Sequence, residues 1–129
     1  MWVEEEKKRV DDDSLRERAS DSEKAWNARD RDAWERLWRE AVPGEHVLES
    51  PVGSGPKRGF AAARSQVWDE VQPVTIHTRH LIVSGTSVAA LTENVMASDG
   101  QTFSVFSIDT YDFDESGNCH ERNYFSIPE

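Results

Sequence analysis

Three turn signals divide the C-terminal half of this chain into four segments with the character of β-strands. The turns are Ser84-Gly85-Thr86, Ser98-Asp99-Gly100 and the run 114–117. Asp-Gly between two strand-like segments is a strong hairpin signal, because it supplies the positive φ angles that tight hairpin turns need. The pattern therefore predicts an antiparallel meander with strands at residues 74–83, 87–96, 102–113 and 119–127.

The N-terminal half predicts three helices and one short strand. Apolar residues recur at helical spacing after Ser14, again after the N-cap residue Asp30, and again from Phe60 to the stop at Pro73. A short strand at 45–49 separates the second helix from the third. Because the helices precede the meander, the predicted class is α+β, with helices covering the concave face of a curved sheet. We expect residues 1–13 to form a charged N-terminal extension and residues 14–129 to form a single domain.

Charge and cysteine content argue against several classes of protein. The chain has 129 residues, with 25 acidic and 15 basic side chains and a net charge of −10, which argues against nucleic acid or an anionic membrane as partner. The single cysteine, Cys119, excludes an intrachain disulfide and fits a reducing compartment. No apolar run approaches the roughly 18 residues of a membrane span, and residues 1–13 lack the apolar core of a signal peptide. We therefore expect a cytoplasmic protein.

The segment 48–59 is the most informative motif of the chain. It begins Leu48-Glu49-Ser50-Pro51-Val52-Gly53 and continues through a loop rich in glycine and proline into the helical run 60–71. Together with segments 78–113 and 117–125, it resembles the steroid Δ-isomerase, SnoaL-like branch of the NTF2-like superfamily. The resemblance implies an NTF2-like (cystatin-like) cone enclosing one deep apolar pocket. It also implies a homodimer that pairs through the outer face of the sheet.

The resemblance carries over only part of a catalytic set. In that family an aspartate before the Pro-Val-Gly turn moves a carbon-bound proton, while a tyrosine and a protonated aspartate hydrogen-bond the dienolate oxygen. Asp109 corresponds to the protonated aspartate. Ser50 stands at the position of the base, which a serine hydroxyl cannot replace. The tyrosine position falls on Ser22 or, with a small shift, on Trp26.

The pattern of the surrounding residues also supports Asp109 as a candidate catalytic residue. Two-residue alternation places it on one strand face with Ser107 and Tyr111, among apolar and aromatic neighbours. Desolvation on such a face raises the pKa of a carboxyl. We therefore expect Asp109 to donate a hydrogen bond to a substrate carbonyl or to act as a general acid. The alternative is a half-exposed aspartate paired with a neighbouring arginine.

The register of the last strand leaves two sets of pocket residues open. If the preceding hairpin is one residue short, Asn123 and Phe125 face the pocket; if it is not, Arg122 and Tyr124 do, because a slip of one residue exchanges the faces. Tyr111 or Tyr124 would replace the lost hydroxyl donor.

Four further residues complete the candidates. Asn94 would bind a ligand oxygen, or its amide would be satisfied by the neighbouring strand. Trp26 would wall the cavity against a flat ligand, although a tryptophan at helical spacing is more often a core residue. The missing base would be Glu49, if a bulge at the Pro51 turn directs it inward, or His77.

The function expected from these patterns is a small-molecule isomerase, cyclase or dehydratase that acts on a largely apolar, carbonyl-bearing molecule without a cofactor. The alternative is a non-catalytic binding protein for a hydrophobic small molecule. An epoxide hydrolase would need an Asp-Arg-Asp set around a water, which the sequence does not assemble. We expect no metal site, because His77 and His80 fall on opposite strand faces and no third ligand stands at a typical spacing.

Overall fold

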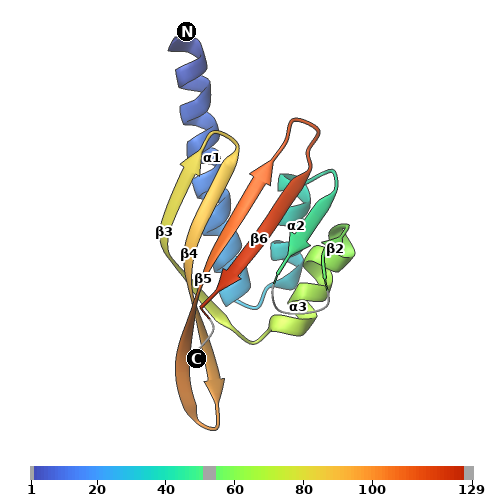
Figure 1. Cartoon of the computed structure of the whole chain (residues 1–129), viewed down its shortest axis with the longest axis vertical. Coiled ribbons are helices and arrows are strands. Elements are labelled where there is room, and N and C mark those ends of the chain that lie inside the picture. Colours follow the sequence, from blue (N-terminus) through green and yellow to red (C-terminus); the bar gives the residue numbers. More distant parts are fainter. Residues whose placement is uncertain (1, 51–54, 127–129) are drawn as a thin grey trace.

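The computed structural model describes residues 2–50 and 55–126 of the chain (Figure 1). The Pro-Val-Gly turn and the end of the last predicted strand lie outside the described residues. In chain order, the elements are α1 (Trp2–Asn27), α2 (Arg31–Ala41), β1 (His46–Glu49), β2 (Lys57–Arg58), a π-helical turn (Ala61–Ser65), α3 (Gln66–Val71), β3 (Thr75–Ser84), β4 (Ser87–Ser98), β5 (Gln101–Phe113) and β6 (Cys119–Phe125).

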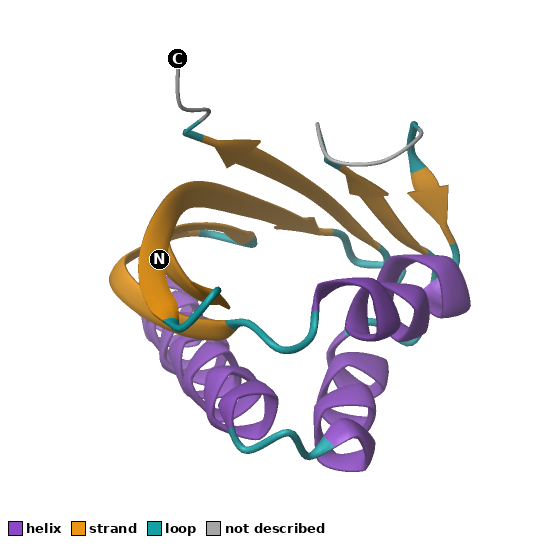
Figure 2. Ribbon diagram, turned by 90° about the horizontal axis from the view of Figure 1, so that it is seen from below, coloured by secondary structure: helices purple, strands orange, loops and turns teal. Residues whose placement is uncertain are grey.

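One six-stranded sheet in the order β2-β1-β6-β5-β4-β3 forms the body of the molecule. Strands β3 to β6 pair antiparallel in sequence order, which confirms the predicted meander. β1 runs parallel to β6, with His46 opposite Cys119, so the sheet is mixed rather than purely antiparallel. The two-residue strand β2 at the edge was not predicted. The sheet curves, and the three helices cover its concave face (Figure 2).

The two long helices meet at a tight reversal that their sequence specifies. Arg29 takes a positive φ of 60°, and Asp30 then caps α2 by accepting a hydrogen bond from the backbone N of Ala33 (3.1 Å). This confirms Asp30 as the N-cap, whose oxygen satisfies one of the unpaired N–H groups of the first turn. The charged N-terminal segment is part of α1, and Figure 1 shows this end of the helix projecting beyond the strands.

The third predicted helix begins with a π-helical turn, which adds a residue to its buried side. Ala63 and Trp68 are buried as their spacing predicts, but a π-helical turn holds more residues than an α-helical turn, so Arg64 is buried with them. Ala63 is fully buried, and Arg64 beside it is only 4% exposed. Val71, which the spacing predicted to be buried, is instead 41% exposed.

Three tryptophans tie the helices together. Trp26 of α1, Trp34 of α2 and Trp68 of α3 pack with ring centroids 5.0 to 5.3 Å apart. The indole Nε1 of Trp26 also donates to the carbonyl of Val74 (2.6 Å), where the chain enters β3. Tilted and edge-on packing at these distances stabilises aromatic clusters beyond the area they bury. Within the described residues, none of the helices combines the length and apolar composition needed to cross a membrane.

Candidate active site

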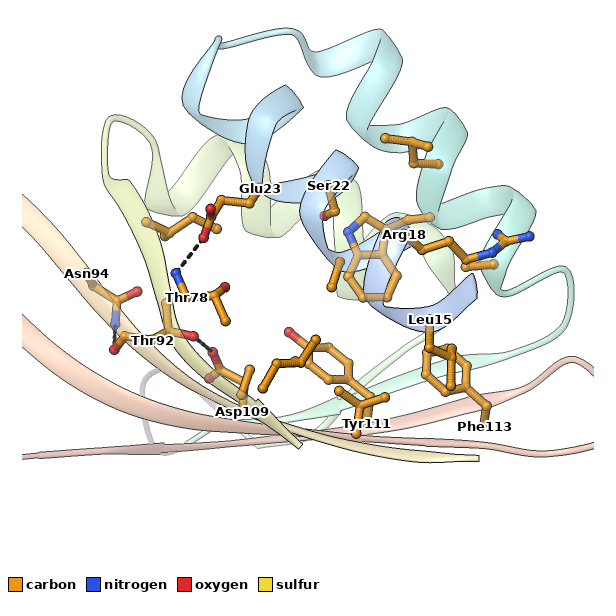
Figure 3. A pocket seen from close by; sticks show the side chains of 18 residues that line it. Leu15, Arg18, Ser22, Glu23, Thr78, Thr92, Asn94, Asp109, Tyr111 and Phe113 are labelled. Carbon is orange, nitrogen blue, oxygen red and sulfur yellow. Dashed lines mark hydrogen bonds between the residues drawn. The ribbon is translucent and has the colours of Figure 1, made fainter. Parts of the chain in front are cut away.

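A cavity of about 140 Å³ lies between the concave face of the sheet and helices α1 and α2. β3, β4 and β5 supply one wall and the two helices supply the other (Figure 3). Most of the lining side chains are apolar, among them Leu37, Ile76, Val88 and Phe113. An apolar lining that also carries polar groups is typical of sites for small, largely apolar molecules.

Asp109 is a partly buried carboxyl on the sheet wall of this cavity. Its Oδ2 accepts hydrogen bonds from the hydroxyls of Thr92 (3.0 Å) and Ser107 (3.4 Å). Its Oδ1 accepts one from the side-chain amide of Asn123 (2.9 Å). No arginine pairs with it in the described residues, so the arrangement is not the surface ion pair considered as the alternative.

The pKa of Asp109 is raised to about 6. Burial is the largest cause, and the negative charge of Glu121 is the second; the hydrogen bonds from Thr92, Ser107 and Asn123 act in the opposite direction. A carboxyl with this pKa exists in both protonation states close to neutral pH. It can therefore accept and return a proton there, which an ordinary surface aspartate does poorly.

Tyr111 stands two residues along β5 from Asp109, about 7 Å away along the strand, and also points into the cavity (Figure 3). Its ring packs against Trp38, with centroids 5.5 Å apart. Burial, together with the nearby carboxylates Glu121 and Asp109, holds the pKa of the phenol well above its usual value. Its hydroxyl makes no hydrogen bond to the described residues and stays protonated at neutral pH, so it remains available to donate to a ligand.

Glu121 of β6 is the centre of a buried charge network beside Asp109. Its Oε1 accepts from the guanidinium of Arg64 and lies 2.9 Å from Nε2 of His46. Its Oε2 accepts from Asn123 (3.2 Å), whose amide also donates to Asp109. The two carboxyl groups are thus joined through one amide.

The charge states in this network follow from its contacts. Burial alone would raise the pKa of Glu121, but Arg64 and His46 outweigh it and the pKa lies below its usual value. Burial lowers the pKa of His46, which is 0% exposed. Glu121 is therefore a carboxylate and His46 a neutral donor at pH 7, and the guanidinium of Arg64 also stacks on Trp38 at 4.4 Å.

The helix wall carries two charged residues that the sequence analysis did not single out. Arg18 and Glu23 both line the cavity from α1. Oε1 of Glu23 accepts from the backbone N of Thr78 (2.5 Å) and so joins α1 to β3. Helical periodicity is the signal that could have found both, because Arg18 lies four residues before Ser22 and Glu23 lies four residues after Ala19, and Ser22 and Ala19 both line the cavity.

A second hollow of about 390 Å³ adjoins the cavity at Asn94, which lines both. Ser50, Asn123 and Phe125 line this second hollow, as does Met96. Asn94 uses its amide to donate to the carbonyl of Val105 (2.9 Å) and to Ser107 Oγ (3.0 Å). The amide is thus satisfied by the neighbouring strand, while the residue still lies at the boundary between the two spaces.

Comparison with solved structures identifies the architecture. The epoxide hydrolase/cyclase-like enzyme SalBIII, which acts in pyran ring formation in the polyether salinomycin, is similar with a TM-score of 0.71 and 22% identity, over 91% of this chain and 94% of that one. An NTF2-like protein of unknown function from Burkholderia pseudomallei K96243 gives a TM-score of 0.66 and 16% identity, over 85% and 88% of the two chains. The chain has the NTF2-like fold.

A third similar structure comes from Shewanella denitrificans OS-217. It is described as a SnoaL-like polyketide cyclase and gives a TM-score of 0.64 at 11% identity, over 86% of this chain and 89% of that one. No family model and no curated protein matches the sequence. At these identities the likeness establishes the NTF2-like architecture, whereas the chemistry depends on the residues of the site.

The predicted site residues are divided between the cavity and the second hollow. Asp109, Tyr111 and Ser22 line the cavity, Ser50, Asn123 and Phe125 line the second hollow, and Asn94 lines both. The register of β6 decides the question left open by the sequence, because Asn123 pairs with Asp109 and Phe125 with Ser107. Ser50 and Asp109 therefore do not face a common space among those the structure defines.

Four candidates lie away from both spaces. Tyr124 points to the outer face, where it is 54% exposed, because it pairs with the outward residue Ile108. Trp26 belongs to the tryptophan core instead of the cavity wall. Glu49 sits at the surface and binds Arg122 (2.8 Å). His77 lines neither space, so neither candidate for a replacement base reaches the cavity.

Proposed function

We propose that this protein is a cofactor-independent enzyme that moves a proton on a small, largely apolar, carbonyl-bearing molecule, as an isomerase, cyclase or dehydratase does. The observation that carries the proposal is the pairing of Asp109, with its pKa about 6, and the unpartnered hydroxyl of Tyr111 in one apolar cavity. Enolisation needs at least a proton acceptor and a neutral hydrogen-bond donor. Here the two groups stand two residues apart on one strand.

In the proposed reaction, the substrate carbonyl accepts a hydrogen bond from Tyr111. The carboxylate of Asp109 removes a proton from the carbon beside the carbonyl, and the electron pair of the broken C–H bond moves toward the oxygen that Tyr111 stabilises. Asp109, now a carboxylic acid, returns the proton to another carbon or to a leaving hydroxyl. No electrons are gained or lost, so the step needs no redox partner.

This assignment changes the role expected of Asp109. With a pKa about 6, the carboxyl is mostly ionised at pH 7, so it begins as the base and becomes the acid only after the first transfer. The hydrogen-bond donor is then Tyr111. A serine at position 50 is no obstacle to such a reaction, because the proton acceptor stands on β5.

The structural neighbours support this class of chemistry without fixing it. One is named for cyclase and epoxide hydrolase-like activity and another for polyketide cyclisation. Both names describe reactions in which protons move on small organic molecules. They guide the choice of substrates for the test.

The experiment follows deuterium exchange by NMR. Aliphatic ketones and a β,γ-unsaturated steroid ketone are incubated in D₂O with the wild-type protein, Asp109→Asn and Tyr111→Phe. Asp109→Asn is expected to lower the exchange rate of the best ketone by about 100-fold or more, and Tyr111→Phe by about 10-fold or more. An Asp109→Asn variant as active as the wild type would overturn the proposal. Asp112→Asn provides the matched control, because Asp112 is exposed on the same strand and lines neither the cavity nor the second hollow.

A binding protein without turnover is the second candidate. It is favoured by the placement of Ser50, which stands where the resembled family keeps its base and lines the second hollow rather than the cavity of Asp109. A protein that binds these ketones, as measured by calorimetry, and exchanges none of their protons would be this carrier.

A further inference from the structure

One charge on the cavity wall has no partner among the residues that the structure describes. Arg18 of α1 is the only lysine, arginine or histidine that lines the cavity among the described residues. It makes no hydrogen bond and no ion pair with the described part of the chain. The other two charged lining residues differ in this respect, because Glu23 holds the backbone of Thr78 and Asp109 accepts three hydrogen bonds.

Arg18 stands at the opposite end of the cavity from Asp109. Figure 3 shows Arg18 near Leu15 and Phe113, whereas Asp109 lies with Thr92 and Asn94 at the other end. The length of the cavity along β5 follows from two residues that both line it, Asp109 and Phe113. They are four residues apart, which is about 13 Å along a strand. The space between the two ends is walled mainly by apolar side chains.

We propose that Arg18 binds a carboxylate group of the substrate, so that the natural substrate is an elongated apolar acid with its carbonyl at the far end from the acid group. The assignment of the carbonyl end rests on the proposed function, whereas the acid end rests on Arg18 alone. A guanidinium is suited to this role because its planar fork matches the two oxygens of a carboxylate.

The overall charge of the protein makes a local cation important for any anionic ligand. With a net charge of −10, the protein repels anions at long range. An anionic ligand therefore needs a local cation at its binding site, and Arg18 is the one on this wall. A ligand without charge would gain at most a neutral hydrogen bond from the guanidinium, whereas a carboxylate would also gain the ion pair.

The test compares three ligands by isothermal titration calorimetry. 9-Oxodecanoic acid carries both groups, its methyl ester lacks the negative charge, and decanoic acid lacks the ketone. They are titrated into the wild-type protein, Arg18→Gln, Arg18→Lys and the matched control Arg36→Gln. Arg36 is exposed on α2 and lines neither space, so its variant removes the same charge elsewhere.

We expect the wild type to bind 9-oxodecanoic acid at least about fivefold more tightly than the methyl ester, the effect of one partly exposed charge pair. Arg18→Gln should bring this ratio close to one, Arg18→Lys should keep part of it, and Arg36→Gln should leave it unchanged. An equal affinity of the wild type for acid and ester would overturn the proposal. So would a ratio that survives in Arg18→Gln, or no binding of any of the three ligands.

Decanoic acid separates this proposal from the proposed function. If it binds the wild type as tightly as 9-oxodecanoic acid does, no group in the cavity recognises the ketone, and the roles of Asp109 and Tyr111 fail while the anchor at Arg18 stands. If the ketone matters and the acid group does not, the anchor fails and the proton-transfer site stands.

Discussion

At the scale of single residues, the site depends on the carboxyl of Asp109, which is mostly ionised at neutral pH although its burial disfavours the charged form. Asp109 has a pKa about 6 in the folded protein, against about 3.9 for an aspartate in an unfolded chain. The folded state therefore binds this proton more tightly than the unfolded state. Between about pH 4 and pH 6 the group lowers the free energy of unfolding as pH rises, and the loss is complete above the folded pKa.

Asp109→Asn should therefore stabilise the protein at pH 7.5 while it lowers the proton-exchange rate by about 100-fold or more. The amide removes the buried charge, its oxygen still accepts from Asn123, and its nitrogen can donate to the hydroxyls of Thr92 and Ser107. We expect a gain of about 2 kcal/mol at pH 7.5 and almost none at pH 4, measured by urea denaturation. A gain of equal size at both pH values would show that the charge is not its cause.

The pH dependence of catalysis is expected to report the same group. Because Asp109 begins the reaction as a base, the proton-exchange rate should rise with pH through about 6 and then level off. A rate that falls through pH 6 would instead assign Asp109 as the general acid of the sequence-based expectation.

A substitution at Glu121, which does not line the cavity, should shift the pKa of Asp109. The negative charge of Glu121 is the second cause of the raised pKa of Asp109, so Glu121→Gln should shift the carboxyl titration of Asp109, followed by ¹³C NMR, to lower pH. The variant also leaves the buried Arg64 without its carboxylate, which should cost about 3 to 5 kcal/mol of stability. If it does not fold, Arg64→Met with Glu121→Leu replaces the whole ion pair and allows the same titration. An unchanged titration in a folded variant would contradict the coupling.

At the scale of elements, local sequence signals place the helices and the packing fixes their angles. The Asp30 cap starts α2 where the chain has just reversed, and this start brings Trp34 against Trp26 and Trp68. The helix wall of the cavity thus depends on one capping residue and one aromatic cluster.

Asp30→Ala is expected to lower the free energy of unfolding by about 1 kcal/mol, because it leaves an N–H of the first turn unsatisfied. Asp32→Ala in the same turn is the control. It loses only a favourable interaction with the helix dipole, worth about 0.5 kcal/mol. Chemical denaturation of both variants measures the difference, and equal losses would rule out the cap as the source of the effect.

At the scale of the whole molecule, the two faces of the sheet differ in what covers them. The concave face is covered by helices, whereas the outer face leaves Leu91, Ile108 and Tyr124 exposed in one row across β4, β5 and β6. Phe106 stands two residues along β5 from Ile108 and is also exposed. Contiguous apolar surface of this kind marks an interaction site.

We expect this outer face to pair two copies of the chain, as the resemblance implied. Ile108→Lys, which places a charge at the centre of the row, should convert a dimer into a monomer in light scattering. Thr86→Lys, in the β3–β4 turn, adds the same charge away from the row and should leave the dimer intact. A wild-type protein that is monomeric at all concentrations tested would contradict the prediction.

The sequence by itself determined the three helices, the meander and the face of β5 that carries the site. Turn residues, caps and periodicity are local, so they predicted the meander, the helix order and the common face of Ser107, Asp109 and Tyr111. The tertiary structure alone decided the parallel pairing of β1 with β6, the register that turns Asn123 inward, and the burial of Glu121 with its partners. Arg64 and His46 lie 57 and 75 residues from Glu121 in sequence. No local pattern encodes such contacts, because their energy depends on burial and only the folded chain creates that burial.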